Sequence, residues 1–408
     1  MENTSCRQLA EELLAGCLEG RAWRRAALER LVGAECSAEF FRVVVEGLAD
    51  RFDPLLCQTY ASVFAEALAI ASPGLDAWEI AARYERIRKP RPYRAGAEPP
   101  ETVFVLSRVT LGADVAITSV ILDAVKRRFP DARIELVGSR KNWELFAADP
   151  RIGLVEAAYP RAGSLAERLA AAPALSRTKS IVIDPDSRLT QLGLLQVSAE
   201  DDYYYFDSRA YGADSEASLG ELTRDWVRRT FGIRDPQAYI APLPGAVPAG
   251  RPLVTVSLGV GENPAKRVDD PFETALLRAL TELGGTVYVD EGAGGEESER
   301  VRRAVESCGG RVHTARGAFA PFAWAISQSD LYVGYDSAGQ HVAAACGVPV
   351  VTVFAGFPAP RMLSRWRPSG PGRIEVVRVD PGEGAAPVLE RTLQAIARCR
   401  ILDRGVPT

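Results

Sequence analysis

The stretch from Ser329 to Gly356 constrains the fold of this chain most. Its sequence predicts a strand over Leu331–Tyr335, a tight turn of small residues over Asp336–Gly339, a short helix, and a second strand over Val350–Phe354. The turn therefore lies at a helix N-terminus, where unpaired backbone N–H groups and the helix dipole favour an anion such as a phosphate. This segment predicts one unit of a parallel α/β sheet that carries an anion-binding turn.

Small side chains follow the aspartate of this turn. Ser337, Ala338 and Gly339 add almost no bulk, so a phosphate can approach the backbone closely. His341, one of only two histidines in the chain, lies on the first turn of the helix. Two interpretations stay open. In one, Asp336 or Ser337 only caps the helix and His341 is an ordinary hydrogen-bonded residue; in the other, the turn binds the phosphates of a nucleotide.

Length and composition bound the class of protein. A chain of 408 residues suggests two or three domains, and its 47% hydrophobic and 25% charged residues are typical of a soluble globular protein. A net charge of −4 offers no basic surface for nucleic acid. Seven scattered cysteines without a Cys-x-x-Cys motif predict reduced thiols and no metal site. The N-terminus lacks a secretory signal and the longest apolar run, residues 342–357, is too short to span a bilayer, so we expect a cytoplasmic protein.

Residues 1–92 predict helices only, because their apolar residues recur at helical spacing. Four or five short helices would pack as a small bundle, with Ser37 as one N-cap and Asp53, before Pro54, as another. A basic, Pro-rich linker at residues 93–100 ends this region. Its Arg94, with Arg86, Arg88, Lys89 and Arg91 before it, forms either a solvated linker or a basic patch that contacts anionic lipid or an acidic partner.

From residue 101 the pattern changes to alternating strands and helices, which is typical of parallel α/β sheets. A first Rossmann-like domain covers residues 101–240, a second covers residues 251–385, and residues 386–408 form a final helix and tail. The fold class is therefore α/β, with two Rossmann-like domains that face a cleft and an extra helical N-terminal domain. The strands and helices expected before Ser329 lie at residues 102–107, 114–129, 133–138, 180–184, 254–257, 271–283, 286–289 and 296–307.

The loop from Ser107 to Asp114 joins the first strand to its helix and would face the cleft. It has no Gly-x-Gly-x-x-Gly fingerprint, so a dinucleotide site is poorly supported. Asp114 has two interpretations: it is the N-cap of the helix, or it is a general base that takes a proton from a hydroxyl nucleophile. A carboxylate at a helix start can do both.

Two cations follow the first strand of the second domain. Lys266 and Arg267 end a Gly/Pro-rich loop, residues 259–267, on the same sheet edge as the small-residue turn. They would neutralise a diphosphate, the lysine as a point charge and the arginine through two hydrogen bonds. The alternative is that they are ordinary surface cations.

Two further groups in the first domain have a structural and a functional interpretation. Asp184 and Asp186, separated by a proline, match either a common turn composition or the Asp-x-Asp that holds a metal in single-domain glycosyltransferases. The aromatic run Tyr203–Phe206 is either a packing segment or a platform on which a sugar stacks.

Three motifs in the same order resemble glycosyltransferase family nine, the ADP-heptose:lipopolysaccharide heptosyltransferase group. Residues 114–122 with 126–134 are similar to that family's N-terminal helix and second strand, and Lys266-Arg267 stands where the family has a Lys-rich motif. The resemblance covers residues 101 to about 385. The family's Asp-Thr/Ser-Gly-x-x-His-x-x-Ala-Ala-x-x-x-Pro segment is carried by Asp336, Ser337, Gly339, His341, Ala344, Ala345 and Pro349.

The resemblance implies a GT-B fold and inverting, metal-independent transfer of a heptose-like sugar from a nucleotide diphosphate donor, such as ADP-heptose, without a cofactor. The acceptor would be a glycan or a lipid-linked, lipopolysaccharide-type saccharide in a bacterium, with peripheral contact to the inner membrane. Asp114 would be the catalytic base and Lys266 would hold the donor phosphates. The remaining donor-binding residues would be Arg267, Asp336, Ser337, Ala338, Gly339 and His341.

The chain departs from the family pattern at three places. Ala113 replaces a glycine, Val120 replaces a proline, and Val268-Asp269 replaces an aromatic residue. These departures bear on the identity of the donor more than on the fold. Two alternatives stay open: another GT-B enzyme that uses a UDP- or GDP-sugar, as a transferase or epimerase, and a catalytically silent scaffold that binds a nucleotide sugar.

Overall fold

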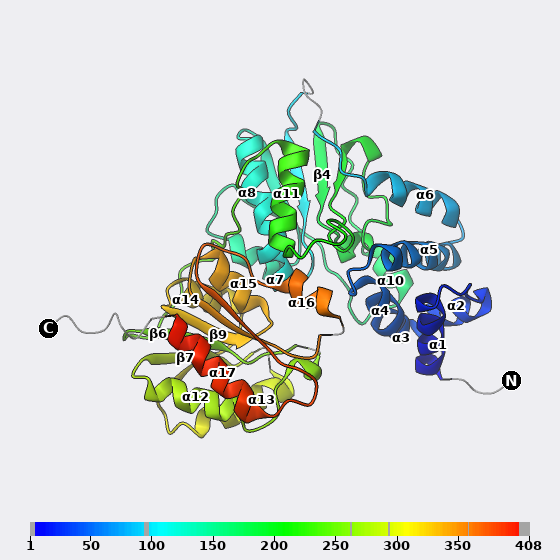
Figure 1. Ribbon diagram of the computed structural model, residues 1–408. Helices are drawn as coiled ribbons and strands as arrows, with labels where there is room; N and C mark the ends of the chain where they lie inside the picture. Colours follow the sequence, from blue (N-terminus) through cyan, green and yellow to red (C-terminus); the bar gives the residue numbers. More distant parts are fainter. Residues whose placement is uncertain (1–4, 94–97, 262, 293, 358, 400–408) are drawn as a thin grey trace.

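The computed structural model describes residues 5–93, 98–261, 263–292, 294–357 and 359–399. Three parts follow one another along the chain: a helical domain (residues 6–87), a first α/β domain (residues 102–231) and a second α/β domain (residues 253–398). Figure 1 shows the helical domain in blue beside the two α/β domains. The expected α/β fold, with two parallel sheets and a helical N-terminal region, is confirmed.

The helical domain packs its helices around buried apolar residues, as their helical spacing predicts. The expected cap before Pro54 is confirmed, because the Asp53 carboxylate accepts hydrogen bonds from the backbone N–H groups at the start of the next helix. The expected cap at Ser37 is wrong: a helix begins at Ser37 itself, and its buried hydroxyl has no hydrogen-bond partner. The elements are α1 Cys6–Leu18, α2 Arg25–Val32, α3 Ser37–Glu39, the π-helical η1 Phe40–Val45, α4 Glu46–Ala49, α5 Pro54–Ala71 and α6 Ala77–Ile87.

A disulfide bond joins Cys6 of α1 to Cys36, the residue before α3, with their Cα atoms 5.1 Å apart. This corrects the expectation that all the cysteines are reduced thiols. The two residues are 30 positions apart in sequence and meet because α1 packs on α3 and η1. Their scattered spacing in the sequence gives no sign of this pairing. The free cysteines of the described residues are Cys17, Cys57, Cys308, Cys346 and Cys399.

Helix α5 is apolar over its full 18 residues, with a mean hydropathy of 1.3. Among the described helices it alone is long and apolar enough to cross a membrane by length and composition, a criterion that the core helix of a globular domain also meets. The apolar run considered in the sequence, residues 342–357, is a different segment. Tyr60, Phe64 and Leu68 on α5 are buried in the helical bundle, and the Tyr60 hydroxyl donates to the carbonyl of Gln191 in the first α/β domain.

The first α/β domain is a five-stranded parallel sheet with the order β3-β2-β1-β4-β5. Its first helical stretch begins at Leu111, three residues earlier than predicted, so Asp114 lies inside the helix and is not its N-cap. The elements are β1 Thr102–Leu106, α7 Leu111–Ala113, the π-helical η2 Asp114–Thr118, α8 Ser119–Arg128, β2 Arg133–Gly138, α9 Arg140–Trp143, η3 Glu144–Phe146, β3 Ile152–Glu156, α10 Leu165–Ala170, β4 Ser180–Asp184, η4 Arg188–Thr190, η5 Glu200–Asp202, β5 Tyr203–Tyr205 and α11 Leu219–Phe231.

The second α/β domain is a six-stranded parallel sheet with the order β11-β10-β9-β6-β7-β8. Two of its inner strands, β9 and β10, are fully buried, as the apolar runs within residues 329–356 predict. The elements are β6 Leu253–Ser257, η6 Pro264–Lys266, α12 Phe272–Glu282, β7 Thr286–Asp290, α13 Gly295–Glu306, β8 Val312–Ala315, α14 Phe319–Ser327, β9 Leu331–Tyr335, α15 Ala338–Ala345, β10 Val350–Phe354, α16 Pro360–Trp366, β11 Ile374–Arg378 and α17 Ala385–Arg398.

The basic segment after the helical domain binds the first α/β domain. Arg86 forms an ion pair with Glu200 at 2.9 Å, and Arg88 forms one with Asp207 at 2.9 Å. Arg91 donates hydrogen bonds to backbone carbonyl groups around the start of β5. These arginines are therefore neither a purely solvated linker nor a free basic patch, because they fasten the helical domain to the sheet. Residues 94–97 of the predicted linker lie outside the described residues.

The two α/β domains touch where α7 meets α15. A Cβ atom added to Gly112 would lie 3.2 Å from the Cα of Ala338 and 3.2 Å from Cδ2 of His341. These distances are tighter than nine in ten real Cβ contacts, so a side chain at Gly112 would require α15 to shift by a few tenths of an ångström. The contact brings the first helical turn of one domain against the small-residue turn of the other, at the carboxyl ends of both sheets.

Candidate functional site

One cavity of ≈ 280 Å³ receives side chains from all three parts of the chain. The first α/β domain contributes the loops after β1, β4 and β5, and the second contributes the turn after β9 together with η6 and α16. The helical domain contributes a single residue, Asp50, from the loop after α4. The lining residues are Asp50, Arg108, Thr110, Gly112, Ala113, Asp186, Arg188, Arg209, Lys266, Asp336, Ser337, Ala338, His341, Met362 and Trp366.

The small-residue turn and the predicted lysine meet on one side of this cavity. Ser337 occupies the N-cap position of α15 but makes no capping hydrogen bond; its hydroxyl lies 3.2 Å from the Tyr332 hydroxyl instead. The Lys266 ammonium group lies 2.7 Å from Oδ2 of Asp336. The other carboxylate oxygen of Asp336 accepts a hydrogen bond from Gln340 at 2.6 Å. The helix terminus therefore faces the cavity with its N–H groups uncapped by a side chain and one ammonium group beside it.

His341 lines the same cavity and is nearly fully buried. Burial lowers the pKa of His341 to about 4, although the carboxylate of Asp336 opposes this shift. Its ring meets the Trp366 ring edge to face, with centroids 5.9 Å apart. His341 is therefore neutral near pH 7, and it presents a hydrogen-bonding nitrogen rather than a positive charge.

Gly339 does not line the cavity. A Cβ atom at Gly339 would lie 2.5 Å from the ring of Tyr332, so glycine is needed here for close packing of α15 on β9. Gly339 thus has a packing role, and its contact with a donor stays a prediction.

Asp114 lies behind the cavity wall and is completely buried. Four groups donate hydrogen bonds to its carboxylate: the Ser107 hydroxyl at 2.6 Å, the backbone N–H of Arg108 at 2.7 Å, the Thr118 hydroxyl at 2.7 Å, and the amide of Asn142. Burial raises the pKa of Asp114, and the hydrogen bonds only partly offset this effect. In this structure the carboxylate holds the loop from residue 107 to residue 113, whose residues form the wall in front of it.

Arg267 also lies away from the predicted site. Its guanidinium group pairs with Asp270 and lies 3.3 Å from Oε1 of the buried Glu273. Arg267 lines a separate cavity of ≈ 460 Å³ beside the carboxyl ends of β10 and β11. The sequence places Lys266 and Arg267 next to each other, but the extended backbone at Arg267 points them to different cavities.

Three arginines that belong to none of the predicted sites form the opposite side of the cavity. Arg108 follows β1, Arg188 follows β4 and Arg209 follows β5. Their position after the carboxyl ends of adjacent parallel strands is the signal that could have identified them. We call these three residues the arginine wall.

Asp186 holds the arginine wall together. Its carboxylate accepts a hydrogen bond from Arg209 at 2.6 Å and lies 3.6 Å from Nη1 of Arg108. Burial raises the pKa of Asp186, but Arg209 and Arg108 outweigh it and hold that pKa below its ordinary value. Burial and the nearby Arg209 lower the pKa of Arg108 to about 10. The wall is thus a crowded, desolvated group of cations that one buried carboxylate neutralises only in part.

Two residues with strained backbone adjoin this wall. Val109 has φ +72° and Asp186 has φ +70°, a region that side-chain-bearing residues rarely adopt and that is most costly for a β-branched residue. Such strain persists where surrounding contacts enforce it, often at functional sites. Here it turns the loops after β1 and β4 so that Arg108 and Asp186 meet.

The remaining predicted residues of the first α/β domain have structural roles. Asp184 is fully buried and accepts hydrogen bonds from Ser187 N–H and from the hydroxyls of Thr190 and Tyr203; burial raises its pKa to about 6. All four residues of the aromatic run at 203–206 are buried, so they cannot form an open stacking platform. Within the described ranges, no group of three or more His, Cys, Asp or Glu side chains is placed to hold a metal ion.

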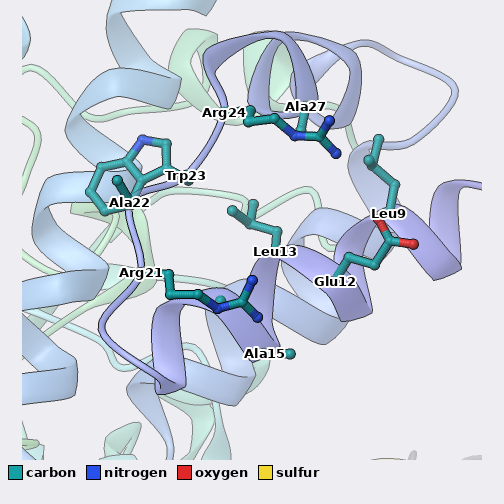
Figure 2. A pocket seen from close by; sticks show the side chains of 10 residues that line it. Leu9, Glu12, Leu13, Ala15, Arg21, Ala22, Trp23, Arg24 and Ala27 are labelled. Carbon is teal, nitrogen blue, oxygen red and sulfur yellow. The ribbon is translucent and has the colours of Figure 1, made fainter.

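A third cavity lies in the helical domain, far in sequence from the arginine wall and from Lys266. It has a volume of ≈ 360 Å³ and lies between α1 and α2 (Figure 2). Leu13 and Trp23 line it together with the arginines 21 and 24. Trp23 donates to Glu66 at 2.7 Å, and Arg21 pairs with Glu19. This cavity is a groove between two helices at the surface. It shares no residue with the cavity between the α/β domains.

Comparisons with known proteins agree with this geometry. Residues 213–377 match the family model "Glycosyltransferase family 9 (heptosyltransferase)". The matched part of the chain is similar to a glycosyltransferase family 9 domain. It contains the small-residue turn, Lys266 and α16, which means that one side of the cavity lies within the matched region. The family match and the shared fold of solved heptosyltransferases support a heptosyltransferase-like glycosyltransferase, as the motifs implied.

Solved structures share the fold at low identity. The glycosyltransferase family 9 protein of Veillonella parvula DSM 2008 has a TM-score of 0.52 at 16% identity, covering 75% of this chain and 98% of its own. Escherichia coli heptosyltransferase WaaC, solved with ADP, has a TM-score of 0.53 at 15% identity, covering 72% and 99%. E. coli ADP-heptose lipopolysaccharide heptosyltransferase II has a TM-score of 0.52 at 17% identity, covering 74% and 100%. No curated protein sequence matches the chain. About a quarter of this chain is therefore additional to what these enzymes contain.

Proposed function

We propose that this glycosyltransferase moves a heptose-like sugar from a nucleoside diphosphate donor to a saccharide acceptor, with inversion at the anomeric carbon and without a metal ion. The observation that carries the proposal is a single cavity with two chemically different sides. Lys266 and the uncapped terminus of α15 form one side, and the loops after β1, β4 and β5 form the other. A donor on one side and an acceptor on the other would meet between them.

The side with Lys266 suits a diphosphate leaving group. As the acceptor oxygen bonds to the anomeric carbon, the bond from that carbon to the diphosphate oxygen breaks and negative charge develops on the diphosphate. An ammonium group and free backbone N–H groups stabilise such charge without reorganising. Lys266 is held in place by Asp336, so a bound diphosphate would compete with this carboxylate for the ammonium group.

Asp114 is the proposed base, which would take the proton of the acceptor hydroxyl. Its raised pKa strengthens it as a base near neutral pH. Its carboxylate must first be reached by the acceptor, because the loop in front of it closes it off in this structure. Hydrogen bonds at catalytic groups are often rearranged when substrate binds.

The identity of donor and acceptor is proposed by analogy. WaaC was solved with ADP and with ADP-2-deoxy-2-fluoro heptose, which supports an ADP-linked sugar as the donor of this chain. The name of heptosyltransferase II supports a lipopolysaccharide-type acceptor. A cytoplasmic location, contact with the inner membrane surface, and independence from any cofactor stay predictions.

The test is a thermal-shift panel of ADP, UDP, GDP and CMP with the full chain. A ligand that binds only the folded state at a hundredfold excess over Kd stabilises it by about 2.7 kcal/mol, so a bound nucleotide raises the melting temperature clearly. We expect the largest shift with ADP and none with CMP. A panel without any shift would refute a nucleotide-diphosphate donor, and a shift only with UDP or GDP would replace the proposed donor.

One observation favours a second candidate, a protein that binds a nucleotide sugar without transferring it. The carboxylate of Asp114 is enclosed by four donors and does not reach the cavity. Under this alternative ADP still binds, but no nucleotide is released from an ADP-sugar in the presence of any acceptor.

A further inference from the structure

The helical domain reaches the cavity through one short segment, residues 50–52. Asp50 lines the cavity and its side chain is 35% exposed, whereas those of Asp114 and Asp186 are buried. Asp50 lies 3.3 Å from Nε of Arg209 and 3.9 Å from Nη2 of Arg188. Among the carboxylates that line the cavity, Asp50, Asp186 and Asp336, the most exposed is therefore the one from outside the two α/β domains.

Phe52 fixes this segment between the two α/β domains. Its φ of +55° is left-handed and its side chain is almost fully buried. Its ring meets that of Trp366 on α16 edge to face, with centroids 6.2 Å apart. Its carbonyl accepts a hydrogen bond from Arg361 at 2.9 Å. Because Phe52 is held by the second α/β domain and Asp50 by the first, the position of Asp50 is set on both sides.

The charges around the arginine wall are balanced only when the helical domain is counted. Arg108, Arg188 and Arg209 carry three positive charges, and Asp186 alone from the first α/β domain offsets one of them. Asp50 and Glu46 of the helical domain offset the other two; Glu46 lies 3.8 Å from Nη2 of Arg188 but is not one of the cavity-lining residues. Without Asp50 the wall would carry an excess positive charge next to the cavity.

We propose that Asp50 is a specificity-determining residue of the acceptor side: it balances the arginine wall so that this side takes uncharged hydroxyl groups and rejects anions. Alternating guanidinium donors and carboxylate acceptors bind the hydroxyls of a polyol, whereas unbalanced arginines bind phosphate or carboxylate groups. The Trp366 ring adds an apolar surface of the kind that such pockets combine with a few polar groups. This inference rests on the proposed function in one respect: the cavity must hold an acceptor.

The test compares Asp50→Asn with a matched control, Glu46→Gln. Both changes remove one carboxylate that faces Arg188, but only Asp50 lines the cavity. The probe is inorganic phosphate, titrated calorimetrically into the full chain with and without saturating ADP, which would occupy the donor side. We expect D50N to bind phosphate at least tenfold more tightly than the wild type, E46Q to change by less than threefold, and the gain in D50N to vanish when Arg188→Ala is added.

Two results would overturn the role of Asp50: phosphate binding by the wild type as tight as that of D50N, or an equal gain in E46Q. If D50N does not fold, Asp50→Ser removes the same charge and is read in the same way. ADP affinity is measured first for each variant. Failure of every protein to bind ADP would count against the proposed function, while the phosphate comparison without ADP would still decide the role of Asp50.

Discussion

The two sides of the cavity are built in opposite ways. On the side of the second α/β domain, one lysine pairs with one aspartate beside a helix terminus whose N–H groups no side chain caps. On the side of the first α/β domain, buried arginines and carboxylates form a dense network with strained backbone at Val109 and Asp186. The first arrangement is open to exchange of its partner, and the charges of the second are balanced only with carboxylates from the helical domain.

This difference separates the part of the cavity that resembles glycosyltransferase family 9 from the part that includes the additional helical domain. The lysine side lies in the segment that matches glycosyltransferase family 9. The arginine side includes a residue from the helical domain, and WaaC covers only 72% of this chain. We infer that the side with Lys266 resembles glycosyltransferase family 9 and that the arginine side is particular to this protein.

The largest change in activity is expected at Asp114, on the side of the first α/β domain. Asp114→Asn removes the proposed base and places an amide NH₂ against hydroxyl and amide donors. Transfer should fall by roughly a thousandfold, within the range of general base catalysis. The free energy of unfolding should fall by about 1–3 kcal/mol, because a buried donor is left without an acceptor. Sugar transfer from an ADP-sugar and urea denaturation measure the two effects.

Thr118→Val is the control for this change, since it removes one hydrogen bond to Asp114 and keeps the carboxylate. It should lower stability but retain most of the transfer rate. Equal losses of transfer in T118V and D114N would show that Asp114 only organises the loop in front of it.

A smaller effect is expected at His341, on the donor side. Its pKa of about 4 lies below the value near 6.5 of an unfolded chain, so the unfolded state takes up a proton first as the pH falls. His341 therefore favours the folded state above pH 6.5 and loses this contribution as the pH falls toward 4. Between pH 7 and pH 5 the loss should be about 2 kcal/mol.

His341→Gln removes this titration and keeps a polar side chain. Urea denaturation at pH 7 and pH 5 should show that the variant loses about 2 kcal/mol less stability than the wild type over this interval. An identical pH dependence for both proteins would mean that His341 is not held neutral in the cavity.

The sequence predicted the positions of the residues on the side with Lys266 well, because its signals are local. A buried strand, a turn of small residues and a helix follow one another within one segment, so the position of Asp336, Ser337 and Ala338 at a helix start follows from their order. Lys266 was expected on the same sheet edge, and it lies 2.7 Å from Asp336. The close packing of Gly339 against the Tyr332 ring, which requires a glycine there, is visible only in the structure.

The acceptor side could not be predicted, because it depends on contacts between distant residues. Asp50 and Arg209 are 159 positions apart, and the arginine wall comes from three separate loops. The helix that begins at Leu111 places Asp114 inside its first turns, where burial rather than capping sets its chemistry. The pairing of Cys6 with Cys36 likewise depends on how α1 packs, which their spacing does not encode.

The most direct test of the central claim is calorimetric ADP binding to Lys266→Ala and Arg267→Ala. The two residues are neighbours in sequence, but only Lys266 faces the cavity between the α/β domains. Loss of a charged hydrogen bond to phosphate, worth about 1.5–3 kcal/mol, should weaken ADP binding about 10- to 100-fold in K266A. R267A should bind ADP within twofold of the wild type. Equal affinity in K266A and the wild type, or a greater loss in R267A, would contradict a donor site at Lys266 and the α15 terminus.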